Sequence, residues 1–257
     1  MKTINKIHQK IIIAAIIITG LFLNTKIALS QDYALKLNGD SYVDLDNTNF
    51  NYSEELTVML EARWTIDPVE GNNWANLVTI NSETQSDRGQ FWIQHNQTNQ
   101  YFEFALATTQ NQNSNNHNRT HMFSTTSPVK DQWYHIAVTY DGNQMKIYVD
   151  GVLENTQNKT GLIYHNQDVF KLTFGAWAYQ GNRKFNGNMN NVSIWNRALD
   201  TNEIINAINN GISDFSEDNL LAFWSFDNVN NPLEESTGNI ETGIVLGEGG
   251  AELEPET

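Results

Sequence analysis

The segment from residue 133 to residue 151 constrains the fold of this chain more than any other feature. It reads WYHIAVTYDGNQMKIYVDG and contains two apolar runs, each closed by an Asp-Gly pair. Such pairs predict β-hairpins in which Asp141 and Asp150 are turn residues, because short loops need positive φ angles that glycine adopts without steric cost. Alternation in the first run is typical of an interior strand of an antiparallel sandwich. Its wholly apolar face consists of Tyr134, Ile136, Val138 and Tyr140.

Similar runs recur along the chain, separated by Gly, Asn and Asp, and they predict an all-β fold. Their even spacing favours a two-sheet antiparallel jelly-roll sandwich. One short helix near the C-terminal end is expected: Asp200 can cap it, Glu203 completes a capping box, and Gly211 fits a C-terminal cap. Its apolar stripe would be Ile204, Ile205 and Ile208. The expected strands are 33–37, 42–45, 56–64, 75–80, 90–95, 101–107, 122–125, 133–140, 145–149, 170–177, 189–195 and 220–226.

The two ends of the chain differ from the middle. Residues 1–30 read as a signal peptide, with lysines before an apolar stretch and Ala28-Leu29-Ser30 at the cleavage position. The apolar stretch, from Ile11 to Leu23, is shorter than the roughly 20 residues of a membrane span. We therefore expect a protein that is secreted, extracellular or periplasmic, with one domain over 31–230. Residues 231–257 are rich in Gly and Glu, and we expect them to form a loose acidic tail.

Composition excludes several classes of function. The 257 residues carry a net charge of −15, which makes nucleic acid and anionic lipid poor partners. The absence of cysteine excludes a thiol nucleophile and disulfides. Neither a His-Glu-x-x-His motif nor a glycine-rich phosphate loop is present.

Several motifs together resemble the laminin-G-like jelly-roll family, the group that includes pentraxins and concanavalin-A-like lectins. They are the opening LKLNGDSYVDL, the strand ELTVMLEARW, the segment 133–151, FNGNMNNVSIWNRALDTNEI and LLAFWSFD. The resemblance covers about residues 33–230 and implies a jelly-roll fold. It does not select one function, because the fold hosts lectins, adhesion modules, hydrolases and spacers.

Related glucanases carry a Glu-x-Asp-x-x-Glu signature on one strand, and this chain lacks it. The nearest match, TIDPVE at residues 65–70, has Thr65 where the first Glu should stand, and Pro68 favours a loop. Since retaining hydrolysis needs two carboxyl groups, we expect no catalytic residues of this kind. An alternative remains open, in which a polysaccharide-active glycoside hydrolase uses a nonstandard pair chosen from Glu61, Asp87 and Glu103. It requires these acids to converge in one groove.

Calcium is the second chemistry that the resemblance implies. The pentraxin Asp-Asn pair corresponds here to Asp87 and Arg88, and the second calcium loop reads AWAY at residues 176–179. Calcium needs six to eight oxygen ligands, so the pentraxin-type site is expected to be absent. A structural calcium stays open as a cofactor, with Asn190 joining Gly39 and Asp40 near the first loop.

The residues that replace the acidic loop suggest a ligand-binding surface instead. An aromatic face beside a guanidinium holds sugar rings or planar acid groups, although core packing is the alternative for the tryptophans. We expect a secreted, non-catalytic binding module that recognises carbohydrate, as a lectin does, or a cell-surface protein. A structural adhesion or spacer domain is the third reading. The candidate ligand-binding residues are Asp87, Arg88, Trp92, His95, Trp177, Tyr179 and Arg183.

Overall fold

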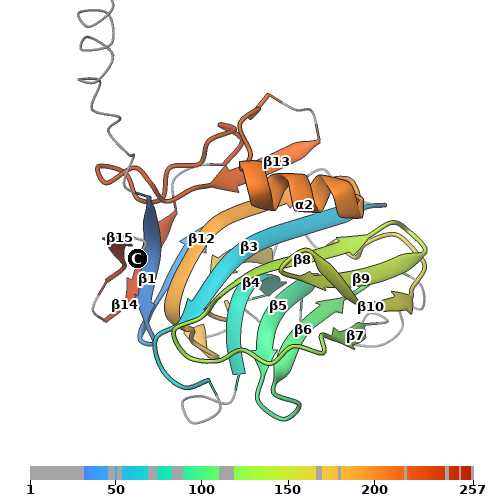
Figure 1. The fold of residues 1–257 in the computed structure, drawn as a ribbon, viewed down its shortest axis with the longest axis horizontal. Helices are drawn as coiled ribbons and strands as arrows, with labels where there is room; N and C mark the ends of the chain where they lie inside the picture. The colour runs from blue at the N-terminus through green and yellow to red at the C-terminus, as the bar shows by residue number, and fades with distance from the viewer. Residues whose placement is uncertain are drawn as a thin grey trace, which may run out of the picture. The chain divides into compact units, whose positions relative to one another are not determined.

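Two antiparallel sheets pack face to face and enclose the hydrophobic core (Figure 1). This arrangement confirms the predicted all-β sandwich, and the described residues include one helix. The expected signal peptide lies outside the part of the chain that the structure describes. The computed structural model describes residues 32–45, 50, 54–68, 74–82, 89–109, 119–165, 170–178, 181–216, 219–240, 243–248 and 250–255.

Sheet A contains the long hairpin predicted from residues 133–151. Its strands are β1 (Tyr33–Asn38), β3 (Leu56–Trp64), β8 (Trp133–Tyr140), β9 (Gln144–Val149), β10 (Val152–Asn158), β12 (Asn186–Trp195), β13 (Leu220–Trp224) and β15 (Glu252–Pro255). The order across the sheet is β10-β9-β8-β3-β12-β1-β15, and β13 also pairs with β12. All strands of sheet A were predicted from the sequence except β10 and β15.

Sheet B forms the other layer and carries the candidate site. Its strands are β2 (Ser41–Leu45), β4 (Trp74–Ser82), β5 (Phe91–Asn96), β6 (Tyr101–Leu106), β7 (Thr120–Phe123), β11 (Phe170–Phe174) and β14 (Ile244–Gly247). Their order is β14-β2-β11-β4-β5-β6-β7.

The apolar face of β8 lies in the core between the sheets, as the alternation predicted. Both Asp-Gly pairs form turns. The carboxylate of Asp141 accepts hydrogen bonds from the backbone N–H groups of Asn143 and Gln144. Asp150 and Gly151 both have positive φ, 50° and 76°, as a two-residue type I′ loop requires. The two aspartates therefore set the turns of the hairpins.

The helix α2 (Thr201–Asn210) lies across the outer face of sheet A (Figure 1), where it covers a second apolar cluster. Its capping box is confirmed, with Asp200 and Glu203 bonding reciprocally, and Gly211 ends it. The apolar stripe is narrower than expected, because Ile204 is buried while Ile205 is 40% exposed. No helix in the described ranges is long and apolar enough to cross a bilayer.

The N-terminal cap gives a first prediction. We expect Asp200→Ala to lower the free energy of unfolding by about 1 kcal/mol, because two backbone N–H groups of the first turn lose their acceptor. Chemical denaturation measures this loss. Glu248→Ala, which removes an exposed carboxylate outside the helix, serves as the control. Equal stability of the two variants would contradict a capping role.

Residues 243–255 correct the expectation of a loose tail after residue 230. Strand β14 pairs with β2 at the edge of sheet B, and β15 pairs with β1 at the edge of sheet A. Glu254 accepts hydrogen bonds from Lys36 and from Asn188. The Gly- and Glu-rich composition suggested disorder, but each strand needs only four residues to pair with an exposed sheet edge. The domain therefore extends to these strands.

Candidate functional site

The outer face of sheet B carries a cluster of polar and aromatic side chains. On β6, Phe102 and Phe104 point into the core, so Glu103 between them points outward. On β5, Phe91 and Ile93 belong to the core, and their neighbours point to the same outer face as Glu103. We call this set the Glu103 cluster; it consists of Trp92, Gln94, Asn96, Glu103 and His121.

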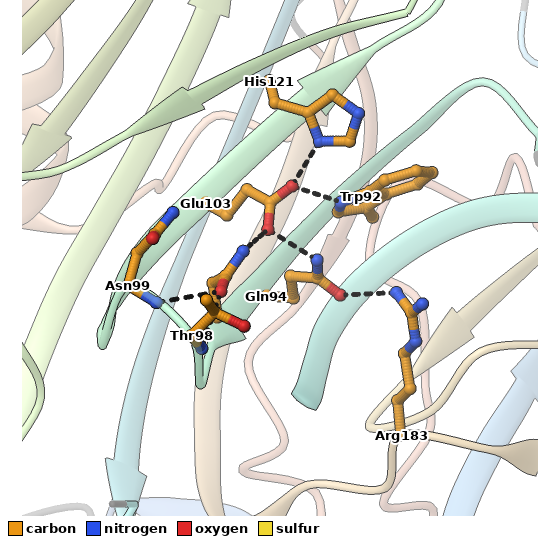
Figure 2. A network of polar contacts seen from close by, with 8 residues as sticks. Trp92, Gln94, Thr98, Asn99, Glu103, His121 and Arg183 are labelled. Atoms are coloured by element: carbon orange, nitrogen blue, oxygen red, sulfur yellow. Dashed lines mark hydrogen bonds and ion pairs between the residues drawn. The ribbon is translucent and has the colours of Figure 1, made fainter. Parts of the chain in front are cut away.

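Glu103 is the centre of the cluster (Figure 2). Its Oε1 accepts hydrogen bonds from Trp92 Nε1 at 3.3 Å and from His121 Nδ1 at 2.6 Å. Its Oε2 accepts from Gln94 Nε2 at 2.7 Å and from Asn96 Nδ2 at 2.6 Å. A carboxylate offers about four lone-pair sites, and these four donors fill them. Three strands, β5, β6 and β7, are thereby joined by one side chain.

The charge of Glu103 is set by these contacts. Its side chain is only 1% exposed, and burial raises its pKa. Hydrogen bonds from His121, Gln94 and Asn96 lower the pKa by more, so that the net pKa lies below the usual value. The carboxylate is therefore ionised at neutral pH, and it holds donors in place rather than carrying a proton.

Further contacts fix the surroundings of the cluster. Asn96 Oδ1 accepts hydrogen bonds from the backbone of Thr98 and Asn99, which orders the turn after β5. The guanidinium of Arg119 lies 4.7 Å above the Trp92 ring, and the His121 ring meets the same indole edge to face. The His121 side chain is 41% exposed, so it can contact a ligand.

Arg183 extends the cluster at the side of β4. Its guanidinium lies 4.9 Å from the centre of the Trp74 ring and 4.3 Å from that of Trp177. Its Nη1 donates to Gln94 Oε1 at 3.2 Å, as Figure 2 shows. Gln94 therefore links this arginine to Glu103, and the described polar groups form one continuous network.

The structure brings together some of the predicted binding residues and separates others. Trp92, Trp177 and Arg183 all belong to the network or its border. His95 does not, because it alternates with Gln94 along β5 and points toward the core, where it is 1% exposed beside Trp64. The expectation for His95 was wrong because successive side chains of a strand point to opposite faces, and Gln94 occupies the outer one. The candidates Asp87, Arg88 and Tyr179 lie outside the described residues.

Sequence reasoning missed several members of the site. Trp74, Gln94, Asn96, Arg119 and His121 were not named as binding residues. Alternation along β5 was the available signal, because it places Trp92, Gln94 and Asn96 on one face. The partners from β4 and β7 could not be found in this way, because they depend on the strand order of the sheet.

A hydrolase would need two of the acids Glu61, Asp87 and Glu103 to lie together. The two that the structure describes, Glu61 and Glu103, lie on opposite faces of the sandwich. Glu61 on β3 points to the outer face of sheet A, where His135 Nδ1 lies 3.3 Å from its carboxylate and Asn191 donates to it at 2.9 Å. Glu103 occupies the outer face of sheet B, on the far side of the core. A retaining pair requires carboxyl groups about 5 Å apart, and these two cannot form one. Asp87 lies outside the described residues.

The candidate calcium ligands are also separated. The register of β1 and β12 places Asn38 opposite Asn186, and Asn190 is four residues further along β12, roughly 13 Å away. Gly39 and Asp40 continue in the opposite direction, and the Asp40 carbonyl accepts a hydrogen bond from Lys184 Nζ at 2.7 Å. Ligands of one calcium lie within about 2.6 Å of it, so these three residues do not share an ion. In the described ranges, no three His, Cys, Asp or Glu side chains group as a metal site. A structural calcium in this chain stays a prediction.

Solved structures of carbohydrate-binding proteins share this fold. A candidate carbohydrate-binding protein of Bacteroides ovatus is 19% identical, with a TM-score of 0.65 over 88% of this chain. This chain spans 60% of that protein's length. The CBM40 of a Ruminococcus gnavus IT-sialidase is 16% identical, with a TM-score of 0.55 over 67% of this chain and 94% of the module. A SAP-like pentraxin of Limulus polyphemus is 15% identical, with a TM-score of 0.51 over 71% of this chain and 85% of the pentraxin. At these identities the likeness establishes the fold alone.

The family of this chain is identified from its sequence. A search for relatives among curated proteins found no match. A model of one protein family, described as the concanavalin A-like lectin/glucanases superfamily, matches residues 37–205. The match begins within β1 and ends within α2, so it includes most strands of both sheets. This chain therefore belongs to the concanavalin A-like lectin/glucanase superfamily.

Proposed function

We propose that this chain is a secreted carbohydrate-binding module, and that the Glu103 cluster, which is buried except for His121, supports the glycan-binding surface on the outer face of sheet B. The observation that carries the proposal is the network itself, in which one buried carboxylate fixes three polar side chains, Gln94, Asn96 and His121, and the indole of Trp92. Sugars are recognised by aromatic faces and by a few fixed polar groups. The carbohydrate-binding descriptions of two structural neighbours support the proposal. Secretion rests on the sequence of residues 1–30.

We propose further that the module does not hydrolyse its ligand. Glu103 is ionised and accepts four hydrogen bonds, so it can neither deliver a proton nor attack a sugar without breaking them. Glu61 lies on the opposite face of the sandwich. Incubation with β-glucans and related polymers is expected to release no new reducing ends. Reducing ends released by the wild type and lost in Glu103→Gln would contradict this proposal.

A glycan array followed by calorimetry tests the binding site. We expect Trp177→Ala to weaken binding of the best array ligand roughly tenfold, because the ring that borders the network is lost. Trp133→Ala is the matched control, because this tryptophan also lies under an arginine, Arg63, but on sheet A. The proposal fails if the wild type binds no glycan, or if the two variants weaken binding equally.

A further inference from the structure

We infer that a pocket between α2 and the outer face of sheet A binds a small primary alkylammonium ion, with Glu61 as the acceptor of its charge. This pocket lies on the far side of the core from the Glu103 cluster, and its ligand differs in chemistry from the proposed glycan. The two sites can therefore be tested separately.

The pocket has an apolar side and a polar side. The register of β3 and β8 places Met59 opposite Ala137, and both belong to the apolar cluster under α2. The next outward-facing pair along the two strands is Glu61 opposite His135, which lines the polar side. Ile208 from α2 also lines the pocket. A ligand held here can contact methylene groups at one end and a carboxylate at the other.

The size of the pocket limits the ligand to a few atoms. Its volume is about 60 Å³. A water-sized group needs roughly 10–15 Å³ on this scale, so the pocket holds about four to six such groups. A sugar ring with its hydroxyl groups is larger than this, whereas an n-butyl chain with one terminal nitrogen matches it.

Glu61 offers this ligand one carboxylate oxygen. Its Oε1 accepts a hydrogen bond from Asn191 Nδ2 at 2.9 Å and lies 3.3 Å from His135 Nδ1. Among the described residues no donor reaches Oε2, and the side chain is 19% exposed. Burial raises the pKa of Glu61, but the contacts with His135 and Asn191 lower it by more, so the net pKa lies below the usual value. The carboxylate is therefore ionised at neutral pH and keeps an acceptor for a ligand.

A β-bulge in β12 directs Asn191 toward this carboxylate. The pairing of β12 with β3 shifts its register between Asn190 and Ser193, and Asn191 has a φ of 47°. Asparagine tolerates this left-handed conformation better than most residues do, and bulges beside binding sites redirect side chains. The backbone N–H of Asn191 donates to Asn190 Oδ1 at 2.9 Å. Glu61 is thus held in place before a ligand arrives, so binding costs little of its side-chain freedom.

The charge of the chain favours a cation in this pocket. A net charge of −15 attracts cations and repels anions over long distances. An ammonium group is a compact charge with three donors, one of which can reach Oε2 of Glu61. Its methylene groups can pack on Met59 and Ile208, as the stem of a lysine packs along apolar surfaces. An alcohol of the same length lacks the charge, and a carboxylate is repelled by Glu61.

Probes of one shape and different charge test this site. n-Butylammonium, n-butanol and n-butyrate are titrated into the full chain, and the methyl NMR signal of Met59 reports binding. We expect butylammonium to bind with a Kd on the order of 1 mM, roughly tenfold more tightly than butanol, and butyrate to bind least. Nα-acetyl-lysine amide carries the same ammonium on a peptide backbone. The tighter binder of the two amines identifies a free amine or a lysine side chain as the source.

Two variants and one control locate the ligand. Glu61→Gln is expected to remove the preference for butylammonium over butanol, because it keeps the shape of the side chain without its charge. Ala207→Leu is expected to weaken both probes, because Ala207 lines the pocket and leucine fills it. Glu248→Gln is the matched control, since it removes the same charge from an exposed position outside the pocket and should keep the preference. Thermal unfolding verifies that every variant is folded.

Three results would overturn this site. The first is a wild type that binds butylammonium no more tightly than butanol. The second is a Glu61→Gln variant that keeps the preference, because the charge would then be recognised elsewhere. The third is an Ala207→Leu variant with unchanged affinity for both probes, because the ligand would then lie outside the pocket.

Discussion

Glu103→Gln is expected to weaken glycan binding at least 100-fold and to lower the free energy of unfolding by about 3 kcal/mol. The substitution keeps the shape of the side chain but turns one acceptor oxygen into an NH2 group. That group then faces two donors, either Gln94 and Asn96 or Trp92 and His121. Buried donors without an acceptor are costly, and the freed side chains no longer hold the positions that the ligand requires.

Calorimetry with the best array ligand and urea denaturation measure the two effects. Glu61→Gln is the control, because it changes a carboxylate with a similarly lowered pKa on the opposite face of the sandwich. It should keep the glycan affinity of the wild type. An unchanged affinity in Glu103→Gln would show that the cluster only supports the sheet.

Acid is expected to destabilise the fold by about 3 kcal/mol between pH 6.5 and pH 4, because of His95. This side chain is 1% exposed, and neither ring nitrogen has a hydrogen-bond partner among the described residues. Burial lowers its pKa to about 4, against 6.5 in an exposed histidine. Between pH 6.5 and pH 4, His95 is therefore protonated in the unfolded chain and mostly neutral in the folded chain. The contribution of the neutral histidine to the free energy of unfolding is therefore fully present above pH 6.5, and it is lost as the pH falls toward 4.

His95→Leu tests the origin of this pH dependence. Leucine has a similar volume and no polar atoms, so we expect the variant to be at least as stable as the wild type at pH 7. The slope of stability between pH 6.5 and pH 4 should become much smaller. The pKa of Glu103 is lowered in the folded chain, so its carboxylate contributes stability that is lost mainly below pH 4.5. Glu103 would therefore account for the loss of stability that remains in stronger acid. If His95→Leu keeps the full slope, the histidine is not its source.

The fold was largely predictable because its signals are local. Alternation in 133–140, the two Asp-Gly turns and the capping box at Asp200 all lie within a few residues. The strands β14 and β15 were missed for a physical reason. They are short, and their pairing depends on free edges of β2 and β1 far away in the sequence.

The candidate site was predicted only in part, because it depends on strand order and strand face together. Trp92, Trp177 and Arg183 were named from their residue types, and they do lie at the cluster. His95 was also named, but alternation along β5 places its side chain in the core, where it is buried. Glu103 was considered as a catalytic acid, whereas its four donors make it a scaffold for binding. Only the register of β5, β6 and β7 reveals those donors.

The pairing of β15 with β1 has a consequence for how the chain folds. The contact between Lys36 and Glu254 joins residues 218 positions apart, and it lies where β1, already paired with β12 on its other edge, pairs with β15. Contacts of such separation make folding slow, since a long loop must close before they form. Slow closure leaves a newly made chain open for longer.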